Sequence, residues 1–136
     1  MAGIKYGGKG NTSEKDFLWE KSRMGTDVAT PVVSNGKIYI LGLNGTIWCI
    51  DILTGNELWQ TVLPSGSGVF YSSPTLAGNK LYITSDEGVF FICEISSSGI
   101  KILDQMKFDD HFVATPVMVQ ERILLRGLMN LYCIGN

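Results

Sequence analysis

The sequence has no closely spaced pair of cysteines. Its three cysteines, Cys49, Cys93 and Cys133, are separated by tens of residues and form no Cys-x-x-Cys motif. Zinc sites and thioredoxin-like centres need such pairs, so the sequence excludes the usual forms of both. Each cysteine lies inside a short apolar run, where a free thiol behaves as a small buried hydrophobic side chain. We therefore predict that the three cysteines are packing residues.

The sequence also lacks an excess of positive charge and a long apolar run. It has 11 basic and 13 acidic residues, for a formal net charge of −2. Nucleic acids and anionic membrane surfaces require a clustered basic face, so we expect no nucleic-acid partner. The longest apolar runs, such as Ile47–Cys49 and Val89–Cys93, are far too short for a membrane span. Residues Met1–Gly10 contain no apolar stretch of the kind found in a secretory signal peptide.

A sustained helical period is absent as well, and a three-fold repeat takes its place. No segment shows apolar residues at a 3.6-residue period, so we predict almost no helix. A short block containing proline recurs three times, and Pro31, Pro74 and Pro116 are 43 and then 42 residues apart. Two apolar blocks follow each proline in the same order, which is the signature of a repeat fold. These blocks are Gly36–Ile40, Asn79–Ile83 and Glu121–Leu125, and then Gly45–Asp51, Gly88–Glu94 and Asn130–Ile134.

Each block has the character of a β-strand. The blocks are short and rich in Ile, Val, Tyr and Phe, and turn pairs such as Asn35-Gly36 and Asn44-Gly45 separate them. A fourth strand is predicted at Glu57–Leu63, with weaker counterparts at Gly99–Met106 and Phe17–Lys21. Four antiparallel strands in a repeat of about 40–45 residues form one blade of a β-propeller.

The run Cys49–Trp59 resembles the tryptophan-docking motif of the quinoprotein-type (PQQ-type) β-propellers. That motif reads Ala-x-Asp-x-x-Thr-Gly-x-x-x-Trp, and the residues that match it here are Asp51, Thr54, Gly55 and Trp59. In that family the Thr-Gly pair forms a tight turn and the tryptophan packs between adjacent blades. The resemblance implies that these residues form a structural docking motif. It adds Trp19, which occupies the position of Trp59 in the preceding repeat.

The resemblance covers nearly the whole chain and implies an all-β fold, a partial β-propeller of about three four-stranded antiparallel blades. We expect a single partial propeller over residues 1–136. Within it, 1–28 would hold the fourth strand and lead-in of an incomplete blade, 29–71 and 72–113 two blades, and 114–136 a last blade without its fourth strand. Propellers typically have four to eight blades. The chain is therefore expected to be the C-terminal part of a longer propeller, or else a homo-oligomer whose copies complete a ring.

The resemblance implies the repeat but not the chemistry of the family's enzymes. Those enzymes hold pyrroloquinoline quinone (PQQ) with a calcium or lanthanide ion and a catalytic aspartate, and many have adjacent cysteines. This sequence has no vicinal cysteine pair and no aspartate in a matching context. We expect no catalytic, cofactor-binding or metal-binding residue in it. The alternative is a fragment of a PQQ-dependent quinoprotein dehydrogenase whose active site lies mostly in other blades.

Non-catalytic members of the family bind other proteins through their loops, which favours a scaffold or protein-binding function. By the same resemblance we expect a periplasmic, cell-envelope or secreted location. The loops that enter the first strand of each blade gather on one face of a propeller. The candidate partner-binding residues in these loops are Met24, Phe70, Tyr71, Asp109, Asp110, His111 and Phe112. For Tyr71 and Phe112, packing between blades is an equally good interpretation. For His111 and its neighbouring aspartates, a solvated loop is the alternative to a cation site.

Overall fold

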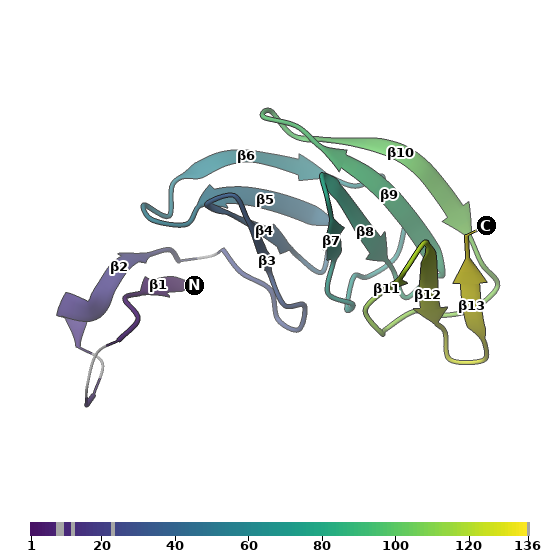
Figure 1. Cartoon of the computed structure of the whole chain (residues 1–136), viewed down its shortest axis with the longest axis horizontal. Helices are drawn as coiled ribbons and strands as arrows, with labels where there is room; N and C mark the ends of the chain where they lie inside the picture. Colours follow the sequence, from purple (N-terminus) through teal and green to yellow (C-terminus); the bar gives the residue numbers. More distant parts are fainter. Residues whose placement is uncertain (8–9, 12, 23, 136) are drawn as a thin grey trace.

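The computed structural model describes residues 1–7, 10–11, 13–22 and 24–135 and is almost entirely β-structure. Across these residues, thirteen strands form four antiparallel sheets, and the one helical element is a 3-10 turn, η1 (Glu14–Asp16). The sheets follow one another along an arc, from β1 and β2 at the left to β11–β13 at the right (Figure 1). The predicted fold class, a partial propeller of antiparallel blades, is confirmed. Within the described part of the chain, no helix has the length and apolar character needed to cross a membrane.

Two of the sheets have four strands, and each follows the order of the chain from its first strand to its fourth. The short Asn-Gly and Gly-Asn turns connect neighbouring strands as hairpins, which produces a meander. The first of these sheets contains β3 (Val32–Ser34), β4 (Lys37–Leu41), β5 (Thr46–Asp51) and β6 (Glu57–Val62). The second contains β7 (Thr75–Ala77), β8 (Lys80–Thr84), β9 (Val89–Ile95) and β10 (Ile100–Lys107).

The sheets at the two ends of the arc have fewer strands. β1 (Ala2–Ile4) pairs with β2 (Phe17–Glu20), and these two form a sheet of their own. At the other end, β11 (Val117–Val119), β12 (Arg122–Arg126) and β13 (Leu131–Ile134) form a sheet of three.

The third repeat has a shorter turn than the block pattern suggests. Five residues separate the paired residues Thr84 and Phe90 of β8 and β9, but four separate Arg126 and Leu131 of β12 and β13. The sequence blocks align Asn130 with Gly88, whereas the strand ladders align it with Val89. Compared with the block alignment, this one-residue difference places each β13 side chain on the opposite face of the sheet.

The core lies between successive sheets. Aromatic and branched side chains from facing sheets meet there in three clusters, and the loop residues Phe70 and Phe112 belong to two of them. Between the two four-stranded sheets, the buried residues include Tyr39, Leu41, Ile47, Trp59, Leu81, Ile83 and Phe91. Between the second of these and the third sheet, they are Phe90, Phe112 and Leu125, with Tyr82, Ile92 and Tyr132 partly buried around them.

One face of the three-stranded sheet is left uncovered. Ile47 and Phe90 are 1% and 0% exposed because the next sheet along the arc covers them. Leu131 occupies the equivalent position in β13 and is 64% exposed. The repeat thus places an apolar side chain at a position that is fully buried in both preceding sheets.

Candidate functional site

The turn between β5 and β6 is organised by the carboxylate of Asp51. Its Oδ1 accepts hydrogen bonds from the Leu53 and Thr54 backbone N–H groups at 3.0 and 2.8 Å, and from the Thr54 hydroxyl at 2.9 Å. The bonds from Thr54 come first in holding the pKa of the Asp51 carboxyl below its usual value. Thr54 in turn accepts from the N–H of Asn56 at 3.3 Å. These contacts fix the turn on which the preceding sheet rests.

Trp19 packs on this turn from the preceding sheet. Its indole Nε1 donates to the carbonyl oxygen of Ile52 at 2.9 Å. The ring lies against Gly55, whose φ is +67°, and a Cβ on Gly55 would be 2.5 Å from Trp19 Cδ2. Glycine supplies both the left-handed backbone and the space that the indole occupies. The predicted docking residues Asp51, Thr54, Gly55 and Trp19 therefore lie together.

Trp59 occupies the corresponding place between the two four-stranded sheets, but its indole nitrogen has no hydrogen-bond partner among the described residues. The Trp59 side chain is more than nine-tenths buried, and its ring centroid lies 6.0 Å from that of Tyr39. Among the side chains that the structure describes, its Nε1 is the buried polar atom without a partner. The turn after β9 differs from the one after β5, because the N–H of Ser96 donates to the carbonyl of Gly99 and closes it as a tight hairpin. The turn after β9, on which Trp59 would dock, therefore differs from the turn after β5, in which the carbonyl of Ile52 accepts the indole N–H of Trp19.

The loops that enter each first strand and the turns between second and third strands form one surface, called here the loop face. It comprises the described residues 21–22, 24–31, 63–74 and 108–116, with the turns 42–45, 85–88 and 127–130. Each later loop is hydrogen-bonded to a neighbouring turn: Phe70 N to Leu43 O at 3.0 Å, and Leu128 N to His111 O at 3.0 Å. Asp86 N donates to Val69 O at 2.9 Å, and Val69 N returns a bond to the Asp86 carboxylate at 2.6 Å. These bonds hold the loops in fixed positions.

Three of the seven predicted partner-binding residues are buried in this surface. Phe70 and Phe112 are fully buried, each four residues before its repeat's proline, and they pack between sheets. Asp110 is buried as well. For Phe112 the inter-blade interpretation describes its position. The four that reach the surface are Met24, which is half-buried, and Tyr71, Asp109 and His111, which are exposed; Arg23, in the same loop as Met24, lies outside the described residues.

Asp110 holds the turn between β12 and β13. Its two carboxylate oxygens accept from the N–H groups of Met129 and Asn130 at 3.1 and 2.9 Å, and from the hydroxyl of Tyr132 at 3.2 Å. Burial by itself would raise the pKa of the Asp110 carboxyl, but these bonds and one from His111 N outweigh it and hold the pKa well below its usual range. The sequence could not show this role, because Asp110 is twenty residues from the turn it stabilises.

The inner rim of the loop face carries one exposed apolar side chain per loop. Val28, Tyr71 and Val113 each lie three residues before a repeat's proline and are 62%, 36% and 49% exposed. The loops touch along this rim, since Thr30 N donates to the hydroxyl of Ser73 at 2.8 Å and the Thr75 hydroxyl donates to the carbonyl of Pro116. Of the three apolar residues, sequence reasoning identified Tyr71 alone. The constant offset from the proline is the signal that identifies the other two.

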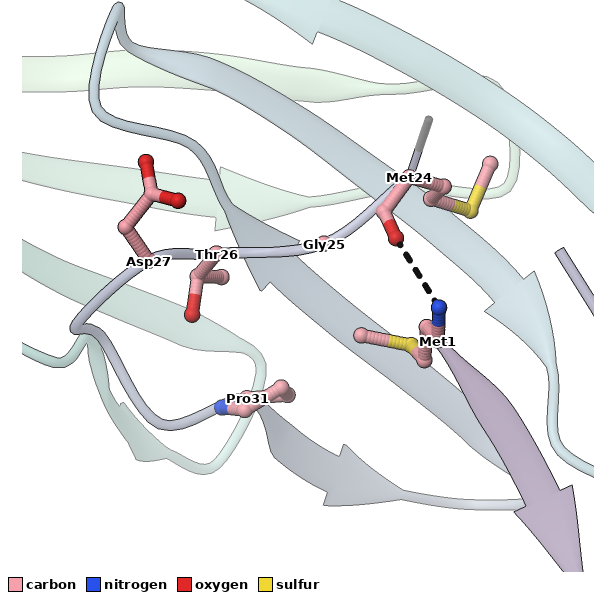
Figure 2. Close-up of a pocket in the computed structure, with 6 residues that line it drawn as sticks. All are labelled: Met1, Met24, Gly25, Thr26, Asp27 and Pro31. Carbon is pink, nitrogen blue, oxygen red and sulfur yellow. Dashed lines mark hydrogen bonds between the residues drawn. The ribbon is translucent and has the colours of Figure 1, made fainter. Parts of the chain in front are cut away.

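A pocket of about 540 Å³ lies beside the first of these loops (Figure 2). The N-terminal nitrogen of Met1 donates to the carbonyls of Lys21 and Met24, at 2.9 and 3.4 Å. Figure 2 shows the bond to Met24 at the edge of the pocket. The lining residues are Met1, Met24, Gly25, Thr26, Asp27 and Pro31.

Within the described part of the chain, no cluster of three or more His, Cys, Asp or Glu side chains could hold a metal ion.

Comparison with known proteins relates the chain to one family. The family described as outer membrane protein assembly factor BamB matches residues 9–101, which is more than half of the chain. BamB of Moranella endobia is 25% identical over 113 residues, or 83% of this chain, and BamB of Salmonella typhimurium is 24% identical over 99 residues, or 73%. The matches cover 28% and 24% of those two proteins, so the chain spans about a quarter of the curated relatives it matches.

Solved structures share the architecture at low sequence identity. The crystal structure of BamB from Moraxella catarrhalis matches 88% of this chain and 36% of its own, with a TM-score of 0.69 and 16% identity. The computationally designed Ika8 protein matches the same shares with a TM-score of 0.69 and 12% identity. The quinohemoprotein alcohol dehydrogenase of Comamonas testosteroni matches 72% of this chain and 16% of its own, with a TM-score of 0.58 and 20% identity. At these identities the likeness shows the fold alone.

Proposed function

Because the chain belongs to the family of the outer membrane protein assembly factor BamB, we propose that it is a non-catalytic propeller segment whose loop face binds another protein. The observation that carries this proposal is the construction of that face. Buried Phe70, Phe112 and Asp110 hold its loops in place, while Tyr71, Asp109 and His111 beside them stay exposed. A braced surface with exposed aromatic and charged side chains loses little conformational entropy when a partner binds.

The family supports a location and a class of partner. The names of the two curated relatives describe factors in outer membrane protein assembly. We therefore propose a cell-envelope location for this protein and, as its partner, a protein of that assembly process. The dehydrogenase alternative is supported by the likeness to the quinohemoprotein alcohol dehydrogenase, which at 20% identity shows the fold alone.

Site-specific photo-crosslinking tests the loop face as the binding surface. A photo-reactive phenylalanine analogue replaces Tyr71 in one variant and Leu103 in the control, because Leu103 is similarly exposed but lies on β10, outside the loop face. In envelope preparations from the native host, we expect a discrete protein adduct from position 71 and none from position 103. Equal adducts from both positions, or none from position 71, would overturn the proposal.

We further propose that additional blades of the same protein cover the open face of the β11–β13 sheet. The exposure of Leu131, and the short share of the relatives that the chain spans, support this. Light scattering on a sizing column tests it with the 136-residue chain by itself. If the face is bare in this chain, we expect association that is polydisperse and depends on concentration. A discrete dimer or trimer would favour the alternative, a ring completed by further copies of the chain.

A further inference from the structure

The three exposed side chains on the inner rim, Val28, Tyr71 and Val113, repeat with the fold. Single exposed apolar residues are common on protein surfaces and need no explanation. These three occupy the same position in successive repeats, three residues before each proline. The contacts between Thr30 and Ser73 and between Thr75 and Pro116 connect the loops along the rim. The side chains therefore form a row that runs across three sheets, called here the rim row.

Buried neighbours fix the backbone at two of the three rim-row positions. Tyr71 and Val113 directly follow Phe70 and Phe112, which are fully buried between sheets. Phe112 also forms a β-bridge with Gly127, and this fastens the loop to the end of β12. Tyr71 and Val113 are thus held in place before any partner arrives, which lowers the entropic cost of binding.

Acidic side chains outnumber basic ones on the loop face. Its described residues include five acidic side chains, of which Asp110 is buried, and Lys21, and the sequence adds Arg23 to the first loop. The ammonium of Lys107 also reaches this face, where it donates to the carbonyl of Glu87. Asp27 is exposed directly before Val28, and Asp109 is exposed in the loop that carries Val113. A partner with basic side chains is therefore attracted to this rim, and one with acidic side chains is repelled.

We infer that the rim row binds an extended segment of a protein partner, one in which apolar side chains alternate with basic ones. An extended chain repeats its side chains on one face every second residue, so it can place successive apolar groups along a row of shallow apolar contacts. The inference rests on the proposed function and adds the chemistry of the partner. A folded partner that docks on the loop face by other residues would leave the rim row unused.

The test uses a defined probe, a fluorescent twelve-residue peptide with valine or leucine at alternate positions and lysine and serine between them. Its control is the same peptide with glutamate in place of lysine. The protein variant Val28→Ser/Tyr71→Ser/Val113→Ser removes the rim row. Its matched control, Leu58→Ser/Ile102→Ser/Leu103→Ser, removes three similarly exposed apolar side chains from the outer strands β6 and β10.

Fluorescence anisotropy at low salt is expected to show saturable binding of the lysine peptide to the wild-type protein. Loss of the rim row is expected to raise Kd by about tenfold or more, the control variant to leave it unchanged, and the glutamate peptide to bind several-fold more weakly. Equal weakening by both triple variants, or equal binding of both peptides, would overturn the inference. Absence of peptide binding would also overturn it. The crosslink from position 71 would then still decide whether a folded partner uses the loop face.

Discussion

The two docking tryptophans differ in one hydrogen bond, and a matched pair of substitutions isolates it. Trp19 and Trp59 are both more than nine-tenths buried between sheets. The Nε1 of Trp19 donates to Ile52 O at 2.9 Å, whereas the Nε1 of Trp59 has no partner in the part of the chain that the structure describes. Phenylalanine in place of either tryptophan removes the N–H and a similar part of the ring. The difference in the free energy of unfolding between the two variants then reports whether each N–H group is hydrogen-bonded.

The magnitude follows from the two environments. Trp19→Phe loses a hydrogen bond with a net contribution of about 1 kcal/mol, in addition to the packing lost with the smaller ring. Trp59→Phe loses the same packing but relieves an unsatisfied buried donor, which costs about 1–3 kcal/mol. We therefore expect Trp19→Phe to lower the free energy of unfolding by about 2–4 kcal/mol more than Trp59→Phe does. Trp59→Ala, which removes the whole ring, is expected to destabilise by about 3–5 kcal/mol.

Urea denaturation followed by circular dichroism measures these differences on the purified chain. Comparing the two variants under one condition removes errors that are common to both extrapolations. A Trp59→Phe variant that is as destabilised as Trp19→Phe, or more so, would show that the Trp59 N–H is satisfied. The second docking site would then hold an acceptor for this N–H group.

Two further predictions concern the docking turn and the Asp110 carboxylate. Gly55→Ala forces a Cβ to within 2.5 Å of Trp19, whereas Gly36→Ala, at a similar φ of +71°, meets no atom within 4 Å. Both variants lose about 1–2 kcal/mol from backbone strain, and we expect Gly55→Ala to lose at least about 1 kcal/mol more in thermal or urea melts; equal losses would contradict the packing argument. Asp110→Asn places an amide donor against the N–H groups of Met129 or Asn130, so its melting temperature at pH 7 should fall measurably. Because the folded pKa of Asp110 is depressed, its contribution is present above the unfolded value of about 4 and is lost as the pH falls below it. The gap in melting temperature between wild type and Asp110→Asn should therefore narrow below about pH 4, and a gap that widens there would refute the assignment.

Much of the architecture could be predicted from the sequence because it depends on local repeats. The proline spacing, the Asn-Gly turns and the apolar blocks predicted the sheets of the blades and their strand order. The block alignment was wrong by one residue in the third repeat, where the turn before β13 is shorter. The pattern of apolar residues does not show how long a turn is, so only the strand ladders of the structure could set the register.

The candidate site was less predictable. The seven loop residues that the sequence identified include three that the structure buries, and the sequence passed over Val28 and Val113. Loops have no periodicity that says which side chain points inward. Aromatic character by itself does not separate a packing residue from a binding residue. The roles of the docking residues and of the partner-binding loops remain predictions that the experiments above test.

The sequence by itself determined the repeat, the strand composition and the chemistry of the Asp51–Thr54–Gly55 turn, since each depends on residues close together in the chain. The tertiary structure alone decided which neighbour in each pair is exposed. Phe70 is buried and Tyr71 is not, and Asp110 is buried while Asp109 is not. The reason is physical: a loop side chain is buried by the next sheet and by turns up to twenty residues away. The path of the backbone over that sheet exists only once the sheets have packed.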